Sequence, residues 1–354
     1  MRVPRVSVLL PTFNALATLP RAVASLRAQT FRDWELLVVD DGSTDGSADW
    51  LRTEAAREPR LKVISQPHAG IVPALNGGLA EARGEFVARM DADDESLPER
   101  LAEQVAWLDA HPDTGVVGAL VEFAGDRTTS AGYALHVDWL NSVVSPEQIA
   151  LNRFVEAPFA HPSVMFRRGL AARHGGYRDG NFPEDSELWL RWLEAGVRMA
   201  KVPRVLLRWH DPPARLSRTD PRYDVEAFYR LKAEYLARWL RANVPAVCNR
   251  RSAGLAAEDG DCKSPALLVW GAGRATRKRV KLLEAHGITV TAYVDVDPHK
   301  HGQSRAGHFV LAPEQVPPDA FHLGYVGKHG AREWCREFLT KGGCVEGRDF
   351  LFAA

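Results

Sequence analysis

Up to residue 90 the chain alternates between short apolar runs and segments with helical spacing, and this alternation constrains the fold most strongly. Strands that alternate with helices form βαβ units with right-handed crossovers, and such strands pair in a largely parallel sheet. An α/β domain is therefore expected in the first part of the chain. The expected strands are 6–10, 35–39, 61–65 and 85–90, and the expected helices are 19–29, 46–54 and 72–83.

Polar residues follow three of these strands at the point where each strand ends. The first strand runs into Pro11 and Thr12, the second into Asp40 and Asp41, and the fourth into an aspartate cluster at 91–94. Parallel sheets bind ligands at the carboxyl ends of their strands, so these residues are expected along one ligand-binding edge. Asp40 could accept a hydrogen bond from a base N–H there, and Pro11 and Thr12 could lend backbone groups to the same ligand.

The run VARMDADD at 87–94 carries a buried strand directly into three aspartates. Carboxylates this close repel one another, so they need a counter-charge from solvent, a basic side chain or a metal ion. Residues two apart on a strand share a face, so Asp91 and Asp93 could converge on one hard cation such as Mg²⁺ or Mn²⁺. The structural alternative is an acidic approach to a helix that begins near Pro98, and Asp94 fits that alternative best.

Two other polar positions have both a structural and a functional interpretation. Asp185, in FPEDSELWLRWLEAG, could stabilise the first turn of a helix whose apolar stripe is core, or it could act as a general base. His210 ends the apolar run VLLRWH, where an imidazole is commonly structural but could complete a metal or phosphate site. The residues alone leave both pairs of interpretations open.

Composition argues against several classes of protein. Lys plus Arg and Asp plus Glu both number 45, and a net charge of zero disfavours a nucleic-acid binder that relies on phosphate attraction. No apolar run approaches the ~20 residues that span a bilayer, and the apolar stretch near the N-terminus is too short for a signal sequence. The four cysteines match no C-x-x-C metal pattern, so reduced thiols and a cytoplasmic location are expected. Peripheral contact with the inner face of a membrane stays open.

The length predicts two domains joined by a linker. Residues 1–242 would form the first domain, the polar, small-residue-rich segment 243–265 the linker, and residues 266–354 the second domain.

The second domain begins with the outline of a dinucleotide-binding βαβ unit. A strand runs into a G-x-G turn, a helix follows, and a second strand ends on an acidic residue at about the expected distance of ~20 residues. Thr276 stands where the third glycine of such a motif is expected. Gly271, Gly273 and Asp295 are therefore candidates for a second nucleotide site, and a structural or interaction domain is the alternative.

Taken together, the segments PTFN, VVDDGSTDGS, GIVPALNGGLAEARGEFVARMDADD, HPSVMFRR and PEDSELWLRW resemble the inverting glycosyltransferases of family 2 in order and spacing over roughly residues 3–220. The resemblance implies a GT-A fold with a mixed, mostly parallel central sheet. It also implies a nucleotide-sugar donor, UDP-linked in most cases, and a Mg²⁺ or Mn²⁺ ion on the DxD motif. The last part of the chain resembles the Rossmann-like α/β domains appended to some bacterial glycosyltransferases.

The resemblance also implies a role for individual residues. Asp185 would be the catalytic base, Asp91 and Asp93 would hold the metal, and His210 would be a further metal ligand. The residues expected to bind the nucleotide or the donor are Pro11, Thr12, Asp40, Asn76, Arg83, Asp91 and Asp93. The implied reaction moves a sugar to a hydroxyl of a glycan or lipid-linked acceptor, as in polysaccharide biosynthesis.

Two other functions are less consistent with the residues. An NAD-dependent role through the C-terminal domain lacks a Tyr/Lys or Cys/His catalytic set beside the glycines. A non-catalytic binding protein on a transferase scaffold would have no reason to keep Asp40, Asp91, Asp93 and Asp185 together.

Overall fold

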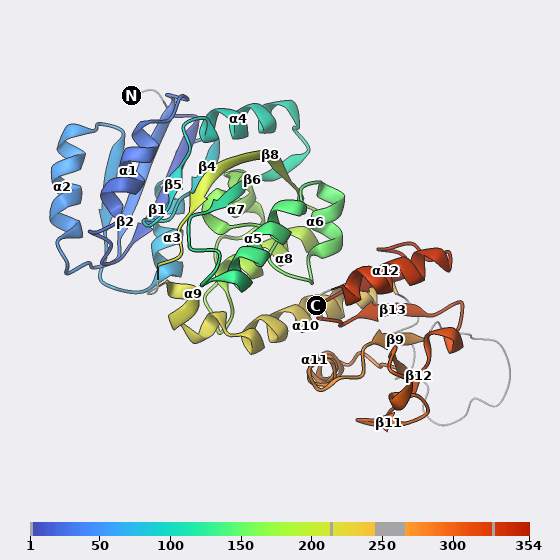
Figure 1. Cartoon of the computed structure of the whole chain (residues 1–354). Helices are drawn as coiled ribbons and strands as arrows, with labels where there is room; N and C mark the ends of the chain where they lie inside the picture. The colour runs from blue at the N-terminus through green and yellow to red at the C-terminus, as the bar shows by residue number, and fades with distance from the viewer. Residues whose placement is uncertain (1–2, 213–214, 245–265, 328–329) are drawn as a thin grey trace. The chain divides into compact units, whose positions relative to one another are not determined.

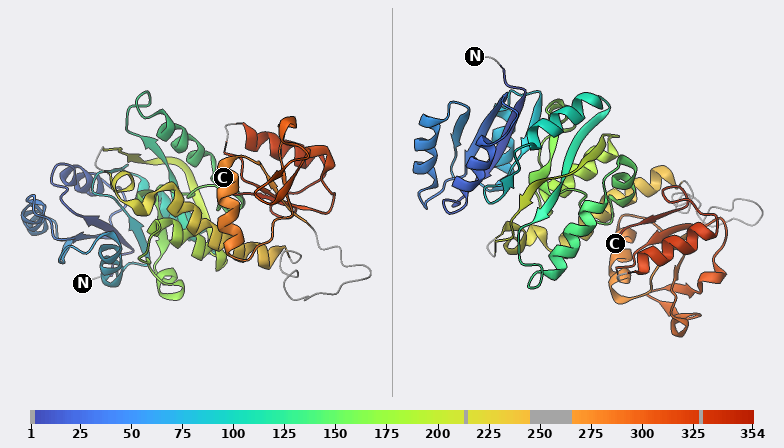
Figure 2. Two further views of the ribbon diagram at one scale, coloured as in Figure 1. Left: turned by 90° about the horizontal axis from the view of Figure 1, so that it is seen from below. Right: turned by 45° about the horizontal axis from the view of Figure 1, so that its top comes forward.

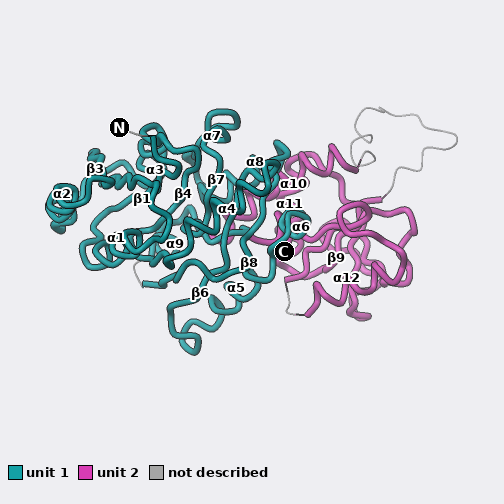
Figure 3. Tube along the Cα trace, turned by 90° about the horizontal axis from the view of Figure 1, so that it is seen from above, with its two compact units in different colours: residues 1–150, 157–223 teal, residues 151–156, 224–354 magenta. Residues whose placement is uncertain are grey.

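The computed structural model describes residues 3–212, 215–244, 266–327 and 330–354, and these residues divide into two compact units (Figures 1 and 3). Unit 1 contains residues 1–150 and 157–223, and unit 2 contains residues 151–156 and 224–354. Helix α10 (Val225–Asn243) groups with unit 2, and the domain boundaries expected from the sequence stay a prediction. Most of the predicted linker, with Cys248 and Cys262, lies outside the described residues.

Unit 1 is built on one eight-stranded mixed sheet. Its strands β1, β2, β3 and β4 are parallel to one another, and β6 is parallel to β8. Strand β7 joins the two groups by antiparallel pairing with β4 and β6, and β5 pairs antiparallel with β8. In spatial order the strands are β3 (Leu61–Ser65), β2 (Trp34–Asp40), β1 (Val6–Thr12), β4 (Phe86–Arg89), β7 (Met165–Arg167), β6 (Thr114–Phe123), β8 (Arg198–Trp209) and β5 (Glu95–Ser96).

Helices cover both faces of this sheet (Figure 2). Successive residues of a strand point to opposite faces, so Val8 of β1 packs in one core with α1, α2, α4 and α5, whereas Leu9 packs in the other with α3 and α8. Burial on both faces explains why β1 and β2 are continuous apolar runs. The last two residues of α6 group with unit 2. The helices and turns of unit 1 are α1 (Leu19–Arg27), α2 (Ser47–Arg57), α3 (Ile71–Glu81), α4 (Arg100–Ala110), α5 (Ala131–Ser142), most of α6 (Pro146–Asn152), η1 (His161–Ser163), α7 (Gly169–His174), α8 (Glu184–Glu194), α9 (Leu216–Thr219) and η2 (Pro221–Tyr223).

Two expectations about helices can be compared with the structure. The apolar stripe of α8 is core, as expected, because Leu188, Trp189 and Trp192 are buried against the α3 face of the sheet. The idea that the aspartates at 91–94 approach a helix N-terminus is wrong. Strand β5 separates them from α4, whose N-cap is Glu99 and makes no side-chain capping bond.

Unit 2 contains a six-stranded sheet in which five neighbouring strands are parallel and β11 is antiparallel to β12. Helix α11 connects β9 to β10, and α12 connects β13 to β14. The strands in spatial order are β11 (Ser304–Arg305), β12 (His308–Leu311), β10 (Ala292–Val294), β9 (Leu267–Trp270), β13 (Phe321–Gly324) and β14 (Phe350–Phe352). The other elements are α11 (Arg274–Ala285), η4 (Pro298–Lys300), η5 (Pro313–Gln315) and α12 (Ala331–Lys341).

Candidate active site

A pocket of about 510 Å³ opens at the carboxyl ends of β1, β2 and β4 in unit 1. These strands are parallel, so their carboxyl ends lie along one edge of the sheet, as expected from the sequence. The wall comes from residues between Pro11 and Thr18, from Asp41, from the turn into α3 that contains His68, from Asp91–Asp93, from Pro212, and from residues between Arg215 and Arg222.

Pro11 and Thr12, predicted to contact the nucleotide, line this pocket. The hydroxyl of Thr12 is buried and has no hydrogen-bond partner within the described residues. Beside it, Phe13 is 45% exposed and its ring stacks on His68 at a centroid distance of 4.0 Å. The first strand therefore ends in an unpaired hydroxyl and a flat aromatic surface, both at the pocket.

Strand β2 places Asp41 on the pocket wall, whereas the predicted residue, Asp40, does not line it. Asp40 is the last residue of β2, is buried, and accepts a hydrogen bond from the backbone N–H of Ser43. The carboxylate of Asp41 accepts hydrogen bonds from the backbone N–H groups of Ala69 (2.9 Å) and Gly70 (2.8 Å) and is thereby fixed beside the turn into α3.

Asp91, Asp93 and Asp94 form a compact acidic cluster, with one carboxylate oxygen of each within 4.8 Å of the others. Burial, followed by the charge of Asp91, raises the pKa of Asp93 and raises that of Asp94 well above its usual range. One oxygen of Asp94 accepts a hydrogen bond from the backbone N–H of His210 at 2.8 Å. Its other oxygen is buried without a hydrogen-bond partner in the described part of the chain.

Two arginines supply positive charge to this acidic cluster. Arg89, buried on β4, forms an ion pair with Asp91. Arg215 lines the pocket and contacts Tyr133, and its guanidinium lies 4.4 Å from the ring centroid of Trp209. Burial alone would lower the pKa of Arg215, but Tyr133 and the three carboxylates raise it above its usual value. The cluster is therefore partly compensated by side chains of the protein itself.

The second acidic motif lies at the start of α8. Asp185 is half-buried, and its carboxylate accepts a hydrogen bond from the backbone N–H of Ser186. Glu184 is buried and accepts a hydrogen bond from the hydroxyl of Tyr223 at 2.5 Å. Burial, followed by the charge of Asp185, raises the pKa of Glu184 to about 7.

Tyr177 connects the two acidic motifs in space. Its buried hydroxyl is 2.8 Å from Nε2 of His161, and burial together with the charges of Glu184, Asp185 and Asp91 raises its pKa. The sheet and α8 thus bring Asp185 into the same electrostatic neighbourhood as Asp91, although Asp185 does not line the pocket described above.

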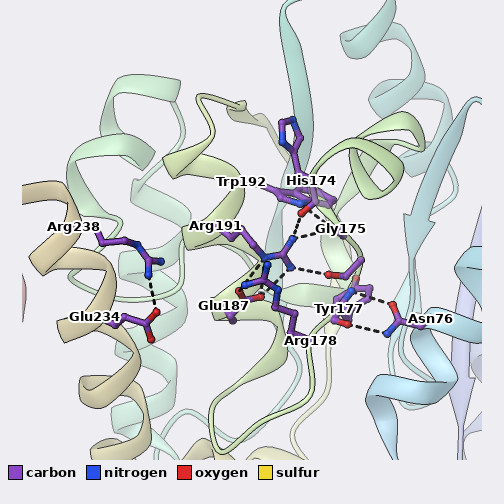
Figure 4. A network of polar contacts seen from close by, with 11 residues as sticks. Asn76, His174, Gly175, Tyr177, Arg178, Glu187, Arg191, Trp192, Glu234 and Arg238 are labelled. Atoms are coloured by element: carbon purple, nitrogen blue, oxygen red, sulfur yellow. Dashed lines mark hydrogen bonds and ion pairs between the residues drawn. The ribbon is translucent and has the colours of Figure 1, made fainter. Parts of the chain in front are cut away.

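The loop that carries Tyr177 is held from two sides (Figure 4). From α3, the Asn76 amide accepts a hydrogen bond from the backbone N–H of Tyr177 and donates one to its carbonyl, at 3.0 and 2.8 Å. From α8, the Arg191 guanidinium donates to the carbonyls of Gly175 and Gly176, and Glu187 binds the same guanidinium. Asn76, predicted to lie near the donor, instead holds this loop.

Two other predicted residues point elsewhere. Arg83 lies at the opposite end of the sheet, where it pairs with Glu35 at 2.5 Å and its backbone N–H donates to Ser7 near the start of β1. The ring of His210 forms a 2.7 Å contact with Glu95, so this side chain is outside the group formed by the three aspartates.

Comparison with known proteins agrees with this architecture. The family model described as "Glycosyl transferase family 2" matches residues 7–175. A "Putative glycosyltransferase EpsE" of Bacillus subtilis is 32% identical over 229 residues, which covers 63% of this chain and 79% of that protein. This chain belongs to glycosyl transferase family 2. The amylovoran biosynthesis glycosyltransferase AmsE of Erwinia amylovora is 30% identical over 205 residues, covering 57% of this chain and 74% of that protein.

A solved structure supports the fold of this glycosyltransferase. The crystal structure of S. aureus TarS residues 1–349, in complex with UDP-GlcNAc, superposes with a TM-score of 0.50 at 18% identity, covering 70% of this chain and 76% of that one. The α/β fold with its mixed sheet is therefore the GT-A type expected from the sequence, accompanied by a smaller unit with a second sheet. Within the described residues, no helix combines the length and apolar character needed to cross a membrane.

Apart from residues 151–156, unit 2 of the glycosyltransferase lies outside the residues matched by the family model. Gly271 follows β9 with a φ of +96°, but the next backbone N–H, of Ala272, donates to the carboxylate of Asp295 at 2.8 Å. Lys300 also binds Asp295, at 3.0 Å. Burial alone would raise the pKa of Asp295, but hydrogen bonds from the backbone N–H groups of Asp297 and Ala272 and from Lys300 lower it. The turn that would face a dinucleotide is thus occupied by Asp295 itself, and Gly273 is exposed.

Five residues that line the pocket or contact the acidic motifs were not predicted as site residues from the sequence. Asp41 directly follows the predicted Asp40 at the end of β2, and both faces of β2 are buried, so strand periodicity does not distinguish the two residues. The segment that contributes Arg215 and Arg222 has no periodicity and gave no signal. The missed residues are Asp41, Arg89, Arg215, Arg222 and Tyr223.

Proposed function

We propose that this glycosyltransferase moves a sugar from a UDP-linked donor to a hydroxyl of a glycan or lipid-linked acceptor, with inversion at the anomeric carbon. The observation that carries the proposal is a pocket at the carboxyl ends of the strands with carboxylates and guanidinium groups on the same wall. A nucleoside diphosphate needs such cations for its phosphates and polar groups for its base and ribose. The choice of UDP is supported by the UDP-GlcNAc complex of the similarly folded TarS.

The nucleoside end of the donor would occupy the part of the pocket formed by β1 and β2. Phe13 offers an aromatic surface for the base, and the unpaired hydroxyl of Thr12 offers a hydrogen bond. Asp41 on the wall is a second candidate for the base N–H beside the predicted Asp40. Pro11 lines the same wall and is the candidate to contribute its backbone carbonyl.

The acidic cluster has the composition of a divalent-metal site. Mg²⁺ and Mn²⁺ take carboxylate oxygens, and the cluster offers Asp91 and Asp93 at the pocket with a buried, unpaired oxygen of Asp94 behind them. We propose that Asp91 and Asp93 hold such an ion together with the donor diphosphate. When bound, the ion would act as a Lewis acid that stabilises the leaving diphosphate. His210 would join the ligands only if its ring left Glu95.

The remaining chemistry falls to side chains of the protein. Arg215 and Arg222 on the pocket wall would neutralise the charge that grows on the diphosphate as the C1–O bond breaks. Asp185 would accept the proton of the acceptor hydroxyl, so that the new bond forms as the diphosphate leaves from the opposite side. A single displacement of this kind inverts the configuration of the sugar.

We also propose that unit 2 is a Rossmann-like domain with a structural or interaction role. Its parallel strand order and the crossover helix α11 support the fold. The hydrogen bond from Ala272 to Asp295 argues against a dinucleotide on the G-x-G turn, because it takes up a backbone N–H that would face the phosphates.

The base assignment can be tested by turnover of UDP-sugars. We expect Asp185→Asn to fold normally and to lower UDP release by about 10²–10⁴-fold, the usual contribution of a catalytic base. The exposed Asp49→Asn on α2 serves as a control with the same change of charge. Full activity of Asp185→Asn would refute the role of Asp185.

A further inference from the structure

Tyr223 links the pocket wall to the acidic pair at the start of α8. It ends the η2 turn, directly after Arg222, which lines the pocket. Its hydroxyl donates a 2.5 Å hydrogen bond to Oε2 of Glu184, and Glu184 precedes Asp185 on the first turn of α8. The η2 turn therefore places Arg222 at the donor pocket and Tyr223 at the acidic pair.

The environment of Glu184 makes this hydrogen bond important. The carboxylate is 2% exposed, so water gives it little solvation. The titratable and charged groups that face it are Asp185 on its own helix, Tyr223 and Arg222 on η2, His161 on η1, Arg89 on β4 and Tyr177 after α7.

These groups differ in how far they can stabilise the ionised form of Glu184. His161 lies 3.9 Å away, and burial together with Arg89 holds its pKa well below the usual range, so it is neutral at neutral pH. Arg89 acts at longer range, since its own ion pair is with Asp91. In the described part of the chain, Tyr223 is the side chain that donates a hydrogen bond to Glu184.

We propose that Tyr223 is a positioning residue of the transfer reaction, whose hydroxyl favours the ionised form of Glu184 and thereby makes Asp185 a stronger base. The proposal rests on the proposed role of Asp185 as the base. Two neighbouring carboxylates titrate as a pair, and a negative Glu184 makes Asp185 a better proton acceptor than a neutral one does. A hydroxyl that donates to the charged form of Glu184 favours that form.

The variant Tyr223→Phe removes only the hydroxyl. Without it, Glu184 becomes protonated at a higher pH, and Asp185 loses its charged neighbour there. We expect the acidic limb of the pH profile of kcat/KM to move up by about 0.5–1 pH unit, the equivalent of one net hydrogen bond. The rate at the high-pH plateau should stay within about threefold of wild type, because Glu184 is ionised there in both proteins.

The control is Tyr229→Phe on α10, which removes a half-buried tyrosine hydroxyl in unit 2. This variant should not shift the pH profile of kcat/KM. A loss of packing alone would lower kcat/KM at every pH without moving the acidic limb. If the acidic limb of Tyr223→Phe keeps its wild-type midpoint, the proposal is overturned, whatever the plateau value of kcat/KM.

A double-variant cycle separates positioning from packing. In a Glu184→Gln background the neighbour cannot ionise, so adding Tyr223→Phe should produce no further shift of the profile. A shift of equal size in both backgrounds would also overturn the proposal, because it would mean that Tyr223 acts by another route.

Failure of the base assignment can be told apart from failure of this inference. Carbon-13 NMR of labelled glutamate side chains in the free enzyme reports the titration of Glu184 without any turnover. If Asp185→Asn is active but the Glu184 titration moves up in Tyr223→Phe, the hydrogen-bond argument stands and the base is misassigned. If the Glu184 titration does not move, the inference on Tyr223 is refuted whatever the base.

Discussion

Arg89 and Asp91, two positions apart at the end of β4, form an ion pair whose cation is buried while its anion reaches the pocket. The Arg89 side chain is 2% exposed and that of Asp91 is 26% exposed. A strand that runs into three carboxylates thus has its first counter-charge from a buried guanidinium on the same strand.

Breaking this pair should cost stability. In Arg89→Met, Asp91 loses its partner while staying partly buried, and removing one member of a buried pair typically costs about 3–5 kcal/mol. We expect a loss of this order in urea unfolding of the variant. Arg204→Met removes a cation paired with Glu103 on the surface, where both side chains are more than one third exposed, and should change stability by less than about 1 kcal/mol. Equal losses of stability in Arg89→Met and Arg204→Met would show that the buried Arg89–Asp91 pair contributes no more to stability than a surface pair does.

The raised pKa of Glu184, about 7, predicts a pH-dependent stability. A carboxyl whose pKa is higher in the folded state binds more protons there, so the folded state loses stability as pH rises from the unfolded pKa toward about 7. Glu184→Gln removes that loss. The free energy of unfolding of Glu184→Gln, relative to that of wild type, should therefore rise between about pH 5 and pH 8, by on the order of 1–3 kcal/mol.

The control for this experiment is Glu122→Gln, a change on the exposed end of β6. Its difference from wild type should not follow the same trend with pH. A Glu184→Gln difference that is flat or falls with pH would mean that burial of this carboxyl is compensated in the folded protein.

Arg215 should contribute to donor affinity through its charge. Arg215→Met removes a guanidinium from the pocket wall, and a hydrogen bond to a charged group is worth about 1.5–3 kcal/mol, so the Kd for UDP should rise about 10–150-fold. The control is Arg218→Met, which changes an exposed arginine that pairs with Asp211 and does not line the pocket. Titration calorimetry of both variants with UDP makes the comparison, and equal affinities would exclude Arg215 from the site.

Removing the Thr12 hydroxyl should affect stability and donor affinity in opposite directions. Thr12→Val keeps the shape and removes a buried hydroxyl that has no partner in the described residues, so stability should be unchanged or slightly higher. If the hydroxyl serves the donor, UDP affinity should fall about 2–12-fold, the equivalent of one neutral hydrogen bond. Unaltered affinity in calorimetry would assign this hydroxyl no part in donor binding.

The sequence predicted the framework of the site well and its details less well. The strands ending at Thr12, Asp40 and Arg89 could be read because apolar runs and parallel pairing follow simple rules, and these rules bring their ends to one edge. Which of the neighbouring residues Asp40 and Asp41 lines the pocket depends on where a strand ends, a difference of one residue that periodicity does not resolve.

Other parts of the site depend on contacts between distant segments. Arg215 and Tyr223 come from an aperiodic stretch whose course is set by packing against Trp209 and Glu184. Asn76 was predicted to lie near the donor, but its side chain holds the Tyr177 loop by hydrogen bonds instead of lining the pocket. Such placements follow from tertiary contacts, which local patterns do not encode.

The most direct test of the central claim is calorimetric titration of UDP and GDP into the protein, once with Mn²⁺ and once with EDTA, for wild type and Asp93→Asn. The exposed Asp113→Asn serves as the matched control. We predict that UDP binds wild type and the control with Mn²⁺, that EDTA weakens this binding strongly, and that Asp93→Asn removes the difference between the two conditions. Equal UDP binding with Mn²⁺ and EDTA, or no binding of either nucleotide, would contradict a metal-dependent nucleotide-sugar site on the acidic cluster.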